Sequence, residues 1–142
     1  MNQRNIFSKG VVLVSAVLLV FVLASCGGKT ETAEDGVSIL TAEDERDERG
    51  WQGRITIAVE GNEIRAVDYD EYDADGNRKS LDSGYADRWS EQYPGMGPAM
   101  AIKQLEAQLV DGGSVDAVDG VSGATGTTSR FQAIAESALA GR

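Results

Sequence analysis

The strongest constraint on the fold is a run of glycines and hydroxyl residues near the C-terminus, residues 119–129. Its glycines permit a tight turn whose backbone N–H groups can approach a ligand, and an apolar helical pattern begins directly behind it. The free N–H groups and the positive dipole end of such a helix start suit a phosphate. The hydroxyls of Ser122, Thr125, Thr127 and Thr128 could donate to phosphate oxygens, or one of them could be bonded to phosphorus. An ordinary loop followed by a helix cap uses the same residue types, so composition leaves both interpretations open.

Part of this run resembles the D-G-x-[ST]-G-A-T signature of the FMN-binding domain family. The matching residues are Asp119-Gly120-Val121-Ser122-Gly123-Ala124-Thr125. The family includes the C subunit of the sodium-pumping NADH:quinone reductase, the G subunit of Rnf complexes and surface flavoproteins of extracellular electron transfer. The resemblance implies that a flavin transferase joins FMN to Thr125 through a phosphoester. It also implies electron transfer to redox partner proteins or a quinone-linked membrane complex.

The resemblance suggests roles for the neighbours of Thr125 as well. The glycines would allow close backbone approach, and Ser122 and Thr127 could hydrogen-bond the phosphate. Asp119 accepts only when it is ionised, so we expect it to pin the turn through backbone N–H groups or to help the transferase recognise the site. The expected cofactor-binding residues are Thr125, Asp119, Gly120, Ser122, Gly123, Ala124, Gly126 and Thr127.

Residues 1–25 have the three parts of an export signal. Arg4 and Lys9 supply a positive start, and the apolar run 11–23 is shorter than the ~20 residues that a membrane span needs. The run ends in Leu23-Ala24-Ser25-Cys26, which resembles a lipoprotein cleavage site at the only cysteine. We therefore expect lipidation of Cys26 and anchoring to the cell membrane or outer membrane, facing outside the cytoplasm. The alternatives are an uncleaved anchor helix and a reactive thiol.

The remaining sequence divides into a polar segment and one domain. Residues 26–50 show little apolar periodicity and contain a mixed charge run, so they predict a disordered acidic tether, followed by the FMN-binding domain over 51–142. The formal net charge of −10 argues against nucleic acid and anionic lipid headgroups as partners.

The pattern within 51–142 predicts an α+β fold with a small, mainly antiparallel sheet and helices packed on one side. Apolar residues alternate over 55–59, and the Gly61-Asn62 turn joins them to a second strand over 64–72, which indicates a hairpin. A helix begins at Pro98 and stops at Gly112-Gly113. The short segment 114–118 could be a strand, and Ser129-x-x-Gln132 fits a capping box at the start of the last helix.

Two further patterns have more than one interpretation. Acidic residues alternate from Glu71 to Asp82, as in a calcium loop, although a hairpin tip explains them more simply. Tyr85, Trp89 and Tyr93 form one helical stripe, and such stripes more often pack in a core than carry a flavin. Proximity in sequence alone suggests Met96, Met100 and Tyr93 as neighbours of a flavin ring.

Histidine is absent from the sequence, which excludes His-based triads and most zinc sites. We expect no metal site, and chemistry that belongs to the cofactor FMN. An electron carrier or a subunit of a redox complex fits better than a stand-alone enzyme. The alternatives are a non-redox surface lipoprotein (an adhesin, antigen or scaffold) and a domain that stores or senses flavin without a covalent bond.

Overall fold

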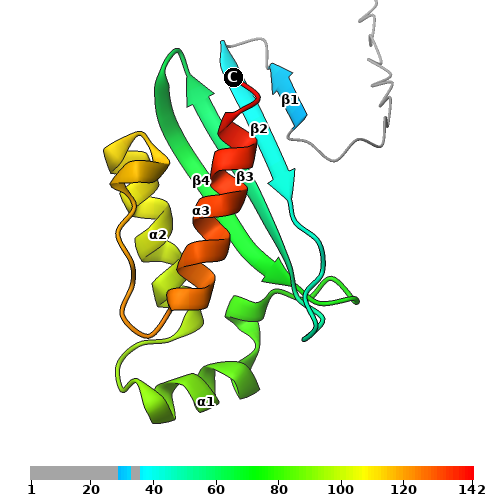
Figure 1. Ribbon diagram of the computed structural model, residues 1–142, viewed down its shortest axis with the longest axis vertical. Helices are drawn as coiled ribbons and strands as arrows, with labels where there is room; N and C mark the ends of the chain where they lie inside the picture. Colours follow the sequence, from blue (N-terminus) through cyan, green and yellow to red (C-terminus); the bar gives the residue numbers. More distant parts are fainter. Residues whose placement is uncertain (1–28, 33–35) are drawn as a thin grey trace, which may run out of the picture.

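The computed structural model describes residues 29–32 and 36–142, and it confirms the predicted α+β fold. Four antiparallel strands form one sheet in the order β1-β2-β3-β4, with α2 and α3 on one face and α1 across one end (Figure 1). The elements are β1 (Lys29–Thr32), β2 (Val37–Glu43), β3 (Gln52–Glu60), β4 (Glu63–Tyr72), η1 (Lys79–Leu81), α1 (Ser83–Gln92), α2 (Pro98–Gly112), η2 (Val115–Ala117) and α3 (Thr125–Leu139). Within this part of the chain, no helix combines the length and the apolar character needed to cross a bilayer.

The predicted hairpin is confirmed as β3 and β4. Ile57 pairs with Val67 and Ile55 pairs with Tyr69, so these side chains share the face that the helices cover. The turn between the strands contains Gly61 in the left-handed conformation (φ 59°), which glycine adopts without steric cost. The alternation of apolar residues therefore fixed both the strands and their inward face.

The prediction of a disordered tether was wrong for the described residues before Trp51. The β2 strand joins the sheet beside β3, where Leu40 pairs with Ile57 and Ala42 pairs with Ile55. Leu40 and Ala42 are buried, and β1 adds a short edge strand beyond them. A strand with only two inward apolar side chains leaves little periodicity in the sequence, which explains the error. The predicted signal peptide and Cys26 lie outside the described residues.

The core lies between the sheet and the two long helices. Phe131 of α3 packs edge-on against Tyr69 of β4, with ring centroids 5.1 Å apart. Leu105 and Leu109 of α2 are fully buried. Gly53 lets α3 approach β3 closely, because a Cβ atom there would lie 2.4 Å from Cδ1 of Ile134.

The beginning of α3 differs from the prediction. The helix begins at Thr125, so Ser129 lies inside it, and the expected capping box is wrong. The Gln132 side chain instead donates from Nε2 to the carbonyl of Val118 at 2.9 Å and holds the preceding turn. Residues 115–117 form the 3-10 helix η2 rather than a strand.

The outer edge of β4 is closed by a side chain from α2. The backbone N–H of Tyr69 donates to Oε1 of Glu106 at 2.8 Å. Burial of this carboxyl raises the pKa of Glu106, although the hydrogen bond from Tyr69 works in the opposite direction. An edge strand with an occupied N–H is a poorer template for pairing with another chain.

Substitution of Gly53 by alanine should destabilise the fold, because the added methyl group would overlap with Ile134. Overpacking of this kind costs about 1–3 kcal/mol in the free energy of unfolding, measurable by denaturant titration. Gly84→Ala in α1 is a suitable control, since its Cβ would meet nothing closer than 3.4 Å and alanine favours a helix. Equal stability of Gly53→Ala and the wild type would contradict the close approach of α3 to β3.

Ionisation of the Glu106 carboxyl should lower the free energy of unfolding as pH rises. Its raised pKa means that the folded state binds the proton more tightly than the unfolded state, so its stabilising contribution is present below pH ~4.5 and is lost as pH rises through the folded pKa. Glu106→Gln keeps an oxygen that can accept from the backbone N–H of Tyr69, and it removes the loss of stability on ionisation. The variant should therefore gain stability relative to the wild type between pH 4 and pH 7 in thermal melts. A constant difference across that range would contradict the raised pKa.

Candidate functional site

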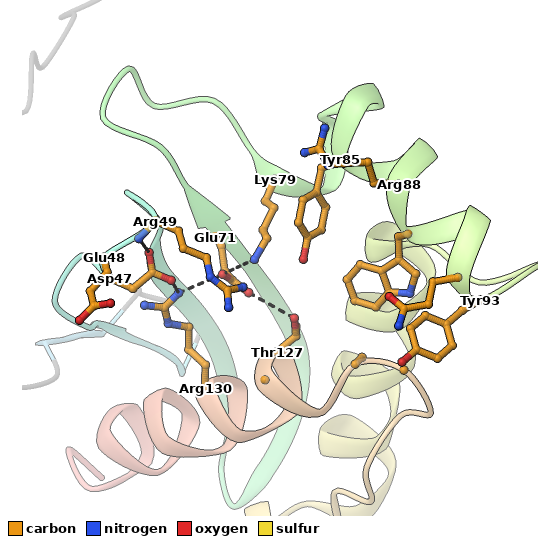
Figure 2. A pocket seen from close by; sticks show the side chains of 15 residues that line it. Asp47, Glu48, Arg49, Glu71, Lys79, Tyr85, Arg88, Tyr93, Thr127 and Arg130 are labelled. Carbon is orange, nitrogen blue, oxygen red and sulfur yellow. Dashed lines mark hydrogen bonds and ion pairs between the residues drawn. The ribbon is translucent and has the colours of Figure 1, made fainter.

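A cleft of about 690 Å³ opens at the end of the sheet that α1 crosses (Figure 2). Its walls come from three separate parts of the chain: the loop between β2 and β3, the segment from η1 through α1, and the first turn of α3. Figure 1 shows the same end of the molecule, where the loops at the lower ends of the strands face α1. Only the tertiary structure brings these segments together.

The glycine-rich run supplies one wall of the cleft. Gly123, Ala124, Gly126 and Thr127 line it, and Thr125 is exposed between them as the first residue of α3. Ala124 precedes the helix and offers no side-chain cap. The first N–H that donates within the helix is that of Thr128, to the carbonyl of Ala124 at 2.8 Å. The preceding N–H groups have no intrahelical partner, which leaves donors for an anion beside the cleft.

The stripe of α1 forms the aromatic wall. Tyr85, Trp89 and Tyr93 all line the cleft, and Trp89 also packs against the core. The rings of Tyr85 and Trp89 meet edge-on with centroids 5.6 Å apart. Tyr93 lies against Gly123, where a Cβ atom would come within 2.9 Å of its ring and where the backbone is left-handed (φ 80°). This glycine is therefore required both by backbone conformation and by the neighbouring ring.

Only one of the three flavin neighbours suggested by sequence proximity lines the cleft. Tyr93 does so, whereas Met96 packs against the hydrophobic core. Met100 is 49% exposed on α2 and does not line the cleft.

The floor of the cleft is a buried ionic network centred on Glu71 (Figure 2). The Glu71 carboxylate accepts from Lys79 Nζ at 2.8 Å, from an Arg130 guanidinium nitrogen at 2.9 Å and from the Thr127 hydroxyl at 3.3 Å. Glu71 and Lys79 are 2% and 7% exposed. A buried charge is costly unless it is paired and hydrogen-bonded, and this carboxylate satisfies both conditions.

Arg130 extends the network to the loop between β2 and β3. Its guanidinium binds Asp44 at 2.6 Å and Asp47 at 3.2 Å, and it donates to the carbonyl of Trp51 at 3.2 Å. The Asp47 carboxylate also accepts from the backbone N–H groups of Arg49 and Trp51. One side chain of α3 therefore holds in place the loop that had been predicted to be a disordered tether.

A second buried carboxylate sets the position of Lys79. Asp70 is 1% exposed and accepts from the backbone N–H of Ser80 at 3.2 Å and from the Ser80 hydroxyl. Arg78 binds Asp68 through two nitrogens, at 2.9 and 3.2 Å. These bonds fix the η1 turn on β4, and Lys79 points from that turn toward Glu71.

The calcium interpretation of residues 71–82 finds no support in the geometry. Glu71 is committed to Lys79 and Arg130, and Asp82 accepts from the N–H of Tyr85 as the N-cap of α1. Asp73 accepts from the N–H groups of Asp75 and Asn77 and shapes the turn. In the described ranges, no three acidic, cysteine or histidine side chains are gathered as metal ligands.

The remaining signature residues lie close together, with contacts that sequence reasoning did not foresee. Asp119, Gly120 and Ser122 are exposed. The turn is held by the backbone N–H of Asp119, which donates to the Gln108 side chain. Among the described residues, the Asp119 carboxylate makes no hydrogen bond to a backbone N–H. The Thr127 hydroxyl donates a hydrogen bond to Glu71 and so holds α3 against the sheet.

Sequence reasoning missed Glu71, Lys79 and Arg130 as site residues. One signal was available: Glu71 continues the inward alternation of Val67 and Tyr69, at a position where an apolar residue would be expected. A carboxylate on the inner face of a strand requires buried partners. The identity of those partners could not be read from the sequence, because they lie 8 and 59 residues away.

The cleft therefore combines three kinds of group that a flavin nucleotide requires. Uncapped helix N–H groups suit its phosphate, aromatic side chains suit its flat ring, and the side chains of Arg49 and Lys79 add positive charge. Histidine is absent from the whole chain, so the cleft offers no imidazole base.

Glu71→Gln should destabilise the protein strongly. The amide leaves Lys79 without a carboxylate partner in the cleft floor, and breaking a buried ion pair costs about 3–5 kcal/mol. Glu60→Gln provides the control, because it weakens an exposed pair with Arg65 and should cost less than about 1 kcal/mol. Urea unfolding measures both changes, and equal effects would show that the network does not stabilise the cleft.

Comparison with known proteins agrees with a cleft that binds a flavin nucleotide. Residues 50–140 match the FMN-binding domain. The 15 kDa lipoprotein of Treponema pallidum (strain Nichols) is 31% identical over 93 residues, which cover 66% of this chain and 65% of that protein. The chain thus matches just under two thirds of the length of this relative.

A solved structure shows the same fold. The CPE2226 protein of Clostridium perfringens superposes with a TM-score of 0.66 at 29% sequence identity, over 70% of this chain and 82% of that chain. The family match covers the sheet from β3 onward, α1, α2, the signature turn and α3. It includes most of the cleft, but the lining residues Asp47, Glu48 and Arg49 precede it. The chain is therefore a flavin-binding protein that belongs to the FMN-binding domain family.

Proposed function

We propose that the protein carries FMN covalently on Thr125 and transfers electrons outside the cytoplasm. The observation that carries this proposal is the position of Thr125: it is exposed at the first position of α3, and its neighbours Ala124 and Gly126 line the cleft. An exposed hydroxyl is accessible to a modifying enzyme. A phosphate attached there would lie beside the uncapped N–H groups of the helix.

The side chains of the cleft would bind and orient the flavin. Gly123 and Gly126 leave space beside the phosphate, and the aromatic wall of α1 offers faces against which a flat ring can pack. FMN would supply the capacity to accept and release electrons. The role of the protein is therefore to hold the ring, to limit its contact with water and to present it to partners.

The Asp119 carboxylate and Ser122 would contact the modifying enzyme and not the bound flavin. Both are exposed on the turn before α3, and neither lines the cleft. A carboxylate beside a phosphate would be repulsive, whereas an exposed one can bind a second protein. We therefore assign Asp119 and Ser122 to recognition by the flavin transferase.

The lipoprotein relative supports a membrane-anchored protein, and Cys26 is the residue that would carry the lipid. Only Gly27 and Gly28 separate Cys26 from Lys29, where β1 begins. The three residue steps from Cys26 to Lys29 can reach at most roughly 10 Å, so such an anchor would hold the domain near the membrane surface. This position favours electron exchange with membrane-bound redox partners over exchange with distant proteins.

Thr125→Ala should abolish covalent flavin. The full-length chain is produced together with a flavin transferase, and intact mass and visible absorbance are measured after denaturation. The wild type should gain the mass of one FMN and remain yellow, whereas the variant should show neither. Flavin mass retained by Thr125→Ala would refute the assignment.

Two matched variants sharpen this experiment. Thr125→Ser keeps the hydroxyl and should retain some modification, and Ser129→Ala removes an exposed hydroxyl one turn further along α3 and should be modified fully. A wild type that binds flavin but loses it on denaturation would indicate a store or sensor. A wild type that never binds flavin would indicate a non-redox lipoprotein. In the native host, Cys26→Ser should release the flavin-loaded protein from the membrane fraction.

A further inference from the structure

Lys79 is a buried cation whose hydrogen-bonding capacity is only partly used. Its ammonium group has three N–H donors. Within the described residues it donates one hydrogen bond, to Glu71 at 2.8 Å, and the residue is 7% exposed. The same nitrogen lies 4.7 Å from the ring centroid of Tyr85 and 5.4 Å from that of Trp51. Cation–π contact with these rings is favourable, but it leaves donors available to a stronger acceptor.

Lys79 strongly affects the net charge of the cleft floor. The network of the cleft floor contains two cations, Lys79 and Arg130, and three carboxylates, Asp44, Asp47 and Glu71. Arg130 contacts all three carboxylates, whereas Lys79 contacts Glu71 alone. The network therefore carries a net charge of −1 with Lys79 present, and its loss would raise the excess negative charge of the floor to −2. An electron-rich ligand would then be disfavoured.

Lys79 also stands beside the surface on which a flat ligand can pack. Figure 2 shows its side chain next to Tyr85, with the ammonium group directed toward Glu71 and with Thr127 across the cleft. Tyr85 belongs to the aromatic wall of α1, which continues through Trp89. A ring packed on this wall therefore has Lys79 as the nearest buried cation.

We propose that Lys79 is a cofactor-facing residue that donates a hydrogen bond to the flavin ring and raises its reduction potential. The proposal rests on the proposed function, because it requires FMN in the cleft. Two electrons from a reductant and one proton from solvent leave one negative charge on the ring, and Lys79 keeps all of its protons. A fixed cation close to the ring stabilises this charged form more than the neutral oxidised form.

The test compares two variants of the FMN-loaded chain. Lys79→Gln removes the charge but can still donate to Glu71, and Lys79→Arg keeps the charge. The midpoint potential is measured by reductive titration against a reference dye. Loss of a buried charge-assisted hydrogen bond should change the ratio of the affinities for reduced and oxidised flavin by about tenfold, equivalent to roughly 30 mV for a two-electron couple. Lys79→Gln should be lower by this amount, and Lys79→Arg should remain close to the wild type.

Lys103→Gln is the control for net charge, because it removes an exposed cation of α2 outside the cleft. Its potential should equal that of the wild type. A Lys79→Gln variant that carries the FMN mass but keeps the wild-type potential would overturn the role of Lys79 and leave the proposed function intact. A wild type without the FMN mass would instead refute the proposed function.

A measurement on the wild type covers the case in which Lys79→Gln does not fold. Lysine ammonium groups labelled with ¹⁵N are observed by NMR before and after reduction of the bound flavin. The Lys79 signal should shift most, and the signals of Lys29 and Lys103 should hardly change, because neither residue lines the cleft. An unchanged Lys79 signal would contradict direct contact with the ring.

Discussion

The buried carboxylate of Glu71 is the interaction on which the rest of the cleft depends. Its partners come from two other segments of the chain: Lys79 from η1, and Thr127 and Arg130 from α3. Through Arg130 the network also reaches the loop between β2 and β3. Replacing such a network by apolar residues is often neutral for stability, whereas removing one partner is costly. We therefore expect the network to contribute to how these segments meet as well as to stability.

This constraint explains how a small domain can offer an open cleft. The hydrophobic core lies between the sheet and the helices α2 and α3, and the carboxyl end of β4 continues beyond it. There the inward position passes from Tyr69, which packs on Phe131, to Glu71, which binds the cations. The same strand thus changes from a core element to the floor of a binding site within two residues. The aromatic wall of α1 then closes the side that the core does not fill.

Periodicity made much of the fold predictable. The alternation around Ile57 identified the hairpin, and Pro98 and the glycine pair at the end of α2 bounded that helix correctly. The β2 strand was not predicted, because its two inward apolar residues, Leu40 and Ala42, are too few to form a periodic pattern. The predicted beginning of α3 was wrong because Ser129 and Gln132 have the spacing of a capping box. In the structure, the Gln132 side chain instead donates a hydrogen bond to the carbonyl of Val118. Local sequence patterns compete with tertiary contacts, and here the hydrogen bond from Gln132 to Val118 replaced the capping interaction that the spacing predicts.

The sequence by itself determined the signature turn, the residue proposed to carry the flavin and the family to which the chain belongs. These depend on neighbouring residues, and backbone conformation and residue type act over short distances. Only the tertiary structure decided which side chains surround that turn. The partners of Glu71, the use of the Tyr85 stripe as a cleft wall and the placement of Lys79 all depend on contacts between distant segments. Such contacts arise from the packing of the sheet against the helices, which leaves no fixed spacing in the chain.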